Sequence, residues 1–250
     1  MTISRKTWDK YIKRLRKLND KAAAEMTEYL RTHMLETKEQ MDDAVAVAYA
    51  LATKYGEGAA ALSCEMYDAM AILSGVVLPA AEPAATATYG DAAKTIYGIK
   101  KHSDNIEMFS AGVGRLVKMA GVDTTLKNGM RDGAEFAWIP AGDTCPFCLM
   151  LASNGWRKAS KVALKGGHAE HIHSNCDCTY AIRFDSQTNV AGYDPDKIYD
   201  HMTQDYDGNW HETINAMRRE DYAEHRDEIR AQQVAAQEPS AKINEVNETA

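Results

Sequence analysis

Four cysteines and one histidine near the middle of the chain have the types and the spacing of metal ligands. They read as C-x2-C, a gap of 24 residues, and then H-x2-C-x-C, formed by Cys145, Cys148, His173, Cys176 and Cys178. Thiolates two residues apart can bind one soft metal ion from a single tight turn, and a second Cys/His pair brought back by a loop completes a tetrahedral site. The spacing therefore predicts a zinc site.

The cluster offers more ligands than one ion needs. A structural zinc takes four ligands, and five strong ones are present. Alternate residues of a strand point to the same face, so Cys176 and Cys178 can share a face and His173 competes with one of them. We expect Cys145, Cys148, His173 and one of Cys176 and Cys178 to hold the ion, and the choice between the last two stays open.

The zinc site is expected to be structural rather than catalytic. A catalytic zinc keeps an open coordination position and needs a general base nearby. Glu170 is the nearest acid, but five strong ligands leave little reason for a vacancy. A module of about 50 residues buries too little apolar area to hold itself together, and structural zinc supplies roughly 10 kcal/mol or more of folding free energy. We therefore expect a protein that is not an enzyme.

Charge is spread unevenly along this chain of 250 residues. The net charge is −7 overall, but residues 1–21 carry a net +6 and residues 185–250 a net −9. These two ends suggest different partners, although solvated helix faces explain much of the pattern. The sequence has no run of 18 apolar residues and no signal-peptide core, so we expect no membrane partner and synthesis in the reducing cytosol. There, clustered cysteines bind metal more often than they form disulfides.

The first half of the chain, which must support the metal site, has the apolar periodicity of helices. We expect helix to about Tyr55, with a break near residues 33–38, and a stop at the glycines of residues 56–58. The further expectations are a helix at 59–74 holding a buried Cys64, a loop at 76–87, a helix at 88–100, a helix capped by Ser103 and ended by Gly121, and a last helix to about Arg131.

The pattern changes after residue 134, where strand-like alternation replaces helical periodicity. Residues 135–140 and 178–184 read as strands on either side of the ligands, with a helical turn at 146–153 and a strand or hairpin between 156 and 165. We expect an extended arm at 185–210, a charged helix at about 212–236 and a disordered tail after 239. The fold class is α+β and mainly helical, with a helical region at 1–131, a zinc-binding α+β module at 132–184, and an arm, helix and tail at 185–250.

A resemblance to the Mu F-type phage head-morphogenesis, or minor capsid, proteins rests on two runs: EFAWIPAGDTCPFCLMLAS at residues 135–153 and HSNCDC at 173–178. That family has an aromatic strand, an Asp shortly before C-x2-C, and a final H-x2-C-x-C. The matching residues here are Trp138, Asp143, Cys145, Cys148, His173, Cys176 and Cys178. Ser174 and Asp177 stand where the family commonly has proline and a basic residue, so only the ligand roles carry over. The resemblance covers residues 88–184 well.

The resemblance implies a low-copy structural protein in the head of a tailed phage or prophage. Its expected partners are the portal protein and the capsid or scaffold proteins. The basic first helix could also make weak contact with packaged DNA. Its expected location is the virion head, and the host cytoplasm during assembly.

Two alternatives stay open. One is an HNH-like zinc nuclease, because residues 169–173 (AEHIH) are similar to the Asp-His-Ile core of such enzymes. Those sites, however, have a second C-x2-C pair followed by a helix, whereas here C-x-C precedes a predicted strand. The other is a zinc-containing regulator that binds nucleic acid through a modest basic patch of Arg157, Lys158, Lys161 and Lys165.

Overall fold

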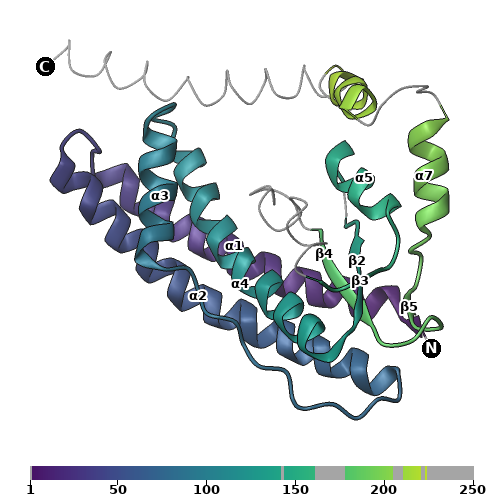
Figure 1. Cartoon of the computed structure of the whole chain (residues 1–250). Coiled ribbons are helices and arrows are strands. Elements are labelled where there is room, and N and C mark those ends of the chain that lie inside the picture. Colours follow the sequence, from purple (N-terminus) through teal and green to yellow (C-terminus); the bar gives the residue numbers. More distant parts are fainter. Residues whose placement is uncertain (1, 142–143, 161–177, 205–210, 221–222, 224–250) are drawn as a thin grey trace, which may run out of the picture.

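The computed structural model describes residues 2–141, 144–160, 178–204, 211–220 and 223. Three long helices, α1 (Arg5–Thr32), α2 (Lys38–Leu73) and α4 (Ile106–Asp132), pack against one another, and the shorter α3 (Tyr89–Lys100) lies on α2 and α4. A small sheet lies at one end of these helices, and α3 lies toward the other end (Figure 1). The mainly helical α+β class is thus confirmed.

The starts of the helices follow from local side-chain chemistry. The Ser4 side chain accepts a hydrogen bond from the Thr7 N–H at the start of α1. Thr37 and Gln40 form a reciprocal capping box at the start of α2, which satisfies backbone donors that a helix leaves open. The expected break between these two helices is confirmed at residues 33–37.

Two expected helix ends are wrong, because glycines that we read as stops lie inside continuous helices. α2 passes through Gly56, and α4 passes through Gly121. A Cβ atom on Gly121 would lie 2.9 Å from the Ser63 Oγ atom, and one on Gly56 would lie 3.1 Å from the Thr86 Cγ2 atom. These glycines therefore allow close approach of the backbone to its neighbours, which offsets their low helix propensity. α4 also begins after Asn105 rather than after Ser103, because Asn105 accepts from the Glu107 N–H.

The predicted loop between α2 and α3 is confirmed. It spans residues 74–88, runs along α4, and is called the strap below. Its backbone is held by side chains of the helices. Asn128 accepts from the Glu82 N–H and donates to the Glu82 carbonyl, and Thr124 accepts from the Ala84 N–H. Arg131 donates to the carbonyls of the strap near Pro79. The strap thus satisfies its backbone groups without belonging to a sheet.

Five short strands form two sheets among the described residues. The larger sheet has the order β3-β2-β4, with β2 (Glu135–Ile139) antiparallel to both β3 (Arg157–Lys158) and β4 (Thr179–Arg183). The smaller pairs β1 (Thr2–Ile3) in parallel with β5 (Asn189–Val190). The predicted strands around the ligands are therefore confirmed, with β3 shorter than expected.

The segment after residue 184 is not the extended arm that we predicted. It forms β5 and then α7 (Pro195–Thr203), whose start is capped by Asp194. The Tyr193 hydroxyl donates to the Ala152 carbonyl at 2.7 Å and joins this segment to α5 (Pro146–Ser153). The buried contact between Tyr193 and α5 therefore holds the polar segment after residue 184 against the rest of the fold.

The charged helix expected at 212–236 is helical at 211–220, and the remainder of it, like the tail after 239, lies almost entirely outside the described residues. The domain boundaries at 131 and 184 stay predictions. One buried core contains Trp8 of α1 and Tyr67 of α2 together with Trp138 and Tyr180 of the sheet. None of the described helices is long and apolar enough to cross a membrane.

Candidate functional site

The sheet β3-β2-β4 positions the segment that leads to each described cysteine. β2 ends at Ile139, and α5 begins after Cys145. β4 begins at Thr179, which pairs with Ile139, so Cys178 lies at the same end of the ladder at which β2 ends. The antiparallel register thus brings together residues that are more than 30 positions apart in the sequence.

The two predicted ligands of the C-x2-C motif lie at the start of α5. Cys145 is the N-cap, Pro146 follows at the first helical position, and Cys148 is on the first turn. Cys145 is half-buried, and Cys148 is buried with 2% of its surface exposed. The positive end of the helix favours negative charge on groups at its first turn, and this favours the thiolate form that binds metal.

Cys178 is fully buried and contacts Thr144, the residue before Cys145. Its Sγ atom is 3.7 Å from the Thr144 Oγ1 atom, and Thr144 is the neighbour of Cys145 in the chain. The structure therefore places Cys178 beside the residue that precedes the C-x2-C motif. None of the three described cysteines of the cluster forms a disulfide with another described residue.

The other two predicted ligands, His173 and Cys176, lie outside the described residues. The same holds for Asp143, Glu170 and His171. Within the residues that are described, no three His, Cys, Asp or Glu side chains form a set of metal ligands. The zinc site thus stays a prediction, of which three ligands can be placed in the fold.

An aromatic face of the sheet adjoins the cysteines. Trp138 on β2 pairs with Tyr180 on β4, and their rings meet edge to face with centroids 4.6 Å apart. Cys178 is two residues before Tyr180, so strand alternation puts it on this face. The ammonium of Lys118 on α4 is 5.9 Å from the centre of the Trp138 ring, and Phe184 packs against Tyr67 of α2. These contacts place the aromatic face toward the long helices.

Two buried hydrogen-bond donors lie on this aromatic face. Neither the Trp138 Nε1–H nor the Tyr180 hydroxyl has a partner within the described part of the chain. Burial raises the pKa of the Tyr180 hydroxyl far above its ordinary value, and the nearby Cys148 and Asp123 groups act in the same direction. A buried donor without a partner costs about 1–3 kcal/mol, so this face is suited to a neighbouring acceptor such as a thiolate.

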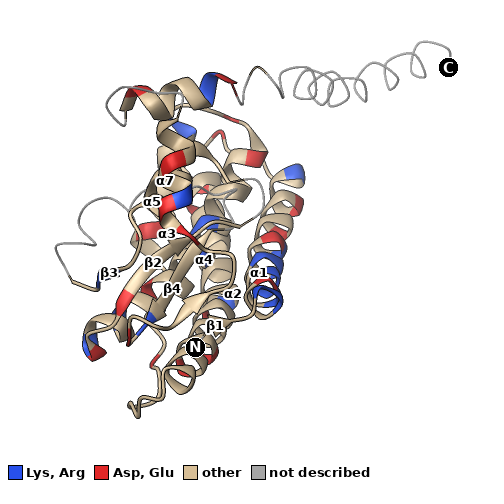
Figure 2. Ribbon diagram, turned by 90° about the vertical axis from the view of Figure 1, so that its right-hand side faces the viewer, with Lys and Arg blue, Asp and Glu red and all other residues tan. Residues whose placement is uncertain are grey.

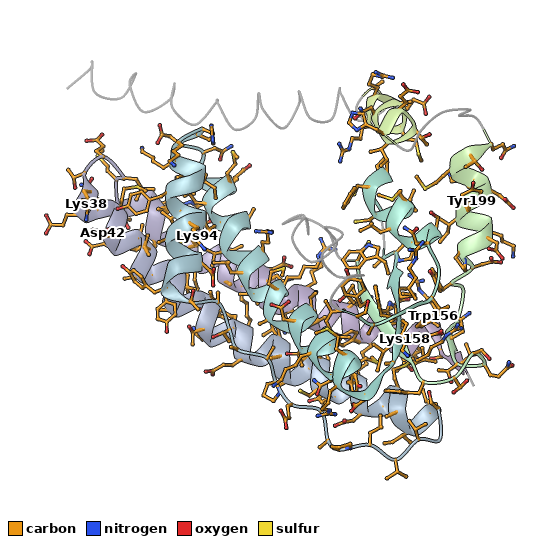
Figure 3. All side chains as sticks on the ribbon, in the orientation of Figure 1. Lys38, Asp42, Lys94, Trp156, Lys158 and Tyr199 are labelled. Carbon is orange, nitrogen blue, oxygen red and sulfur yellow. The ribbon has the colours of Figure 1, made fainter. Side chains whose placement is uncertain are left out.

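The opposite side of the sheet is closed by an ion pair and a stacked cation. Arg183 on β4 donates to Glu135 on β2 at 2.7 Å, and its guanidinium lies over the Trp156 ring at 4.6 Å. Trp156 lies on the sheet side of the molecule, beside Lys158 (Figure 3). Of the basic patch predicted here, Arg157 donates to Asn154 and Lys158 is exposed, while Lys161 and Lys165 lie outside the described residues.

Sequence reasoning missed three residues near the site: Thr144, Lys118 and Asp123. Thr144 contacts Cys178. The only feature of the sequence that pointed to Thr144 was its place directly before the C-x2-C motif. Lys118 is 7% exposed although it lies on a helix with many polar residues, and nothing in its local sequence marks it as buried.

Asp123 lies on α4 at the wall of a cavity of about 490 Å³ between α3, α4 and the strap. Burial raises the pKa of the Asp123 carboxyl to about 6. Among the described residues no hydrogen bond or ion pair offsets this burial. Because the folded state holds the proton more tightly than the unfolded state, the free energy of unfolding falls as the pH rises from about 4 to above 6.

Replacing Asp123 with asparagine removes this pH-dependent cost. We expect D123N to raise the free energy of unfolding by about 1 to 3 kcal/mol at pH 8 and to change it little at pH 4, since asparagine resembles the protonated acid. Urea unfolding of both proteins at the two pH values measures the difference. The control is D91N on the same cavity wall, where hydrogen bonds from Thr88 lower the pKa of Asp91, so that variant should lose stability at neutral pH. An equal effect of D123N at both pH values would contradict the prediction.

The family model of the VG15 protein matches residues 2–205, which include every described element from β1 to α7. The match spans both the helices and the segment that carries the cysteines. No curated protein and no solved structure gives a significant match to the chain. The chain therefore belongs to the VG15 protein family, a family of phage proteins.

Proposed function

We propose that this chain is a structural minor capsid protein in the head of a tailed phage or prophage, where it binds at the portal and procapsid. It is not an enzyme, and a structural zinc ion holds the segment around β2, α5 and β4 together. The observation that carries the proposal is that Cys178 lies just before β4, at the end of the β2–β4 ladder from which β2 leads to Cys145 and Cys148. The membership in a phage protein family supports the setting.

The groups around the cysteines fit a thiolate-bound zinc ion. The thiols come from a helix start and from the end of a strand, and the soft sulfur donors are those that zinc prefers. The Trp138 N–H and the Tyr180 hydroxyl are buried donors without a partner among the described residues, and donors of this kind commonly support metal-bound ligands. In the proposed site Cys145, Cys148, Cys178 and His173 hold the ion.

The strand that follows Cys178 supports a structural role over a nuclease. An HNH-like site needs a helix after its second ligand pair to return another ligand to the metal, whereas β4 follows Cys178 directly. Both long faces of β4 are buried, with residues 178–182 all covered. Zinc at this place would fix a packed sheet against the helices and leave the outer helix faces for neighbouring proteins.

The proposal is tested by analysing phage particles. Procapsids and filled heads purified from a lysogen or an infected culture should contain this chain in fewer copies than the major capsid protein, as measured by quantitative mass spectrometry. The full chain, co-expressed with the portal protein of the same phage, should co-purify with it. A chain found only in the soluble lysate, never in particles or with the portal protein, would overturn the proposal.

A further inference from the structure

Five lysines form a single stripe along the outer side of α1. They are spaced by three or four residues, and all are exposed: Lys6, Lys10, Lys13, Lys17 and Lys21. With 3.6 residues per turn and a rise of 1.5 Å per residue, the five lie within an arc of about 80° and along about 22 Å of the helix. Figure 2 shows the basic turns on this helix.

The lysine stripe lies opposite the side of α1 that packs into the protein. Trp8, Ala22 and Met26 are completely buried on that packed side. At about 100° per residue, their mean direction is about 160° or more from that of the lysines. The lysine stripe therefore faces away from α2 and α4.

The arginines and lysines of α1 differ in what they contact. All four arginines form ion pairs: Arg5 with Asp9, Arg14 with Glu65, Arg16 with Asp20 and Arg31 with Glu28. None of the five lysines forms an ion pair with any residue that the structure describes. Glu25, four residues after Lys21, is bound by Lys54 and by the Tyr55 hydroxyl, and the charge of Lys21 acts on it more weakly. The acids of α1 are therefore each already paired with a cation outside the stripe.

The chemistry of the lysine stripe fits a polyanion better than a protein surface. The centre of a protein–protein interface is depleted of charge and uses apolar or aromatic anchors. The lysine stripe contains no such anchor, and the next residue along the same side of the helix after Lys21 is the small Ala24. Lysine binds a phosphate oxygen as a point charge and needs no fixed two-pronged geometry, which suits contacts to a backbone that do not depend on sequence. A row of charges about one helical turn apart can contact successive phosphates of one strand, and contacts to phosphates need no base recognition.

We propose that the lysine stripe binds the phosphate backbone of duplex DNA without sequence preference. The choice of DNA as the polyanion rests on the proposed function, which places the chain in a head that holds DNA. The binding itself is a property of the isolated chain. Although the whole protein is acidic, the stripe presents five positive charges on one side, and a local field of this kind governs binding at short range.

The purified full chain is tested with a fluorescein-labelled 24-base-pair duplex by fluorescence anisotropy at increasing NaCl. Up to five phosphate contacts predict a slope of log K against log salt of up to about −4.5, which is a loss of several hundredfold in affinity between 50 and 200 mM. Two duplexes of unrelated sequence should bind equally. The absence of binding by the unaltered chain at 50 mM NaCl would overturn the inference.

The decisive variant changes all five lysines of the stripe to glutamine. We expect it to lose at least about tenfold in affinity at 50 mM NaCl, with a slope close to zero. The matched control removes the same charge from exposed lysines of other elements: Lys38, Lys94, Lys101, Lys158 and Lys197. Of these, Lys38 and Lys94 lie toward the end of the helices that is away from the sheet (Figure 3). Equal losses in both variants would overturn the proposal, because they would show an effect of net charge alone.

Two further measurements separate the alternatives. Thermal unfolding followed by circular dichroism should show both variants folded, as expected for exposed positions. Poly-glutamate of matched charge serves as a competitor, and if it binds the stripe more tightly than DNA does, the stripe is a protein-binding surface and the inference is wrong. Absence of the chain from heads would overturn the proposed function but leave DNA binding in solution unaffected, so the two failures are distinguishable.

Discussion

Serine in place of Cys148 is expected to remove stoichiometric zinc from the purified chain and to unfold the segment around α5 and β4. Cys148 is buried at the first turn of α5. The hydroxyl of serine does not replace a thiolate as a zinc ligand, and the free energy of structural zinc binding, on the order of 10 kcal/mol, is coupled to folding. Loss of this ligand should therefore affect the whole sheet.

The measurements are metal analysis by mass spectrometry and limited proteolysis. The unaltered chain should contain one zinc ion and resist cleavage after residue 134, whereas C148S should contain little zinc and be cut in this segment. The control is C64S, because Cys64 lies on α2, apart from the cluster. We predicted a buried Cys64, and the structure places it only half-buried. Full zinc content in C148S, or no zinc in the unaltered chain, would rule out the proposed site.

The second large effect is expected at the centre of the aromatic face. Changing Trp138 to alanine should lower the free energy of unfolding by about 3–5 kcal/mol, the usual cost of removing a large buried aromatic ring. Trp138 is 3% exposed, and its ring contacts Tyr180 edge to face. The lost ring also removes the contact with the Lys118 ammonium of α4, which joins the sheet to the helices.

Chemical denaturation followed by circular dichroism measures this change. Tyr49 is a suitable control, since it is 38% exposed on α2 and its main ring contact is with Tyr89. Replacing Tyr49 with alanine should change the free energy of unfolding by about 0.5 kcal/mol or less. Similar losses for the two variants would show that the aromatic face does not link the sheet to the helices.

The metal-site prediction depended on short-range patterns and stays a prediction, whereas the strands and the helix around the ligands are confirmed. The alternation on either side of the ligands predicted β2 and β4. Both strands are buried on their two faces, and their β-branched and aromatic residues are of the types that sheets favour. The C-x2-C spacing predicted a tight turn, and α5 begins there. Cys178 then reaches Thr144 through strand pairing.

The errors share a physical cause, which is that tertiary contacts override local preference. Glycines at 56 and 121 signal helix ends when only the chain is considered, yet both lie where α2 or α4 approaches a neighbour closely. The polar segment after 184 carries no periodicity, and its strand and helix form because Tyr193 is buried against α5 and β5 pairs with β1. These partners are distant in the sequence, so no local pattern could reveal them.

The sequence by itself determined the chemistry of this protein. Residue types and spacing defined the thiol cluster, the strands beside it, the helical first half and the excess of lysine at the start. Only the tertiary structure decided where these groups lie. Antiparallel pairing of β2 with β4 brought Cys178 to the turn of Cys145, and the packed side of α1 left five lysines on the opposite face. Ligand identity is a local property of side chains, whereas convergence and exposure depend on contacts between elements that are far apart in the chain.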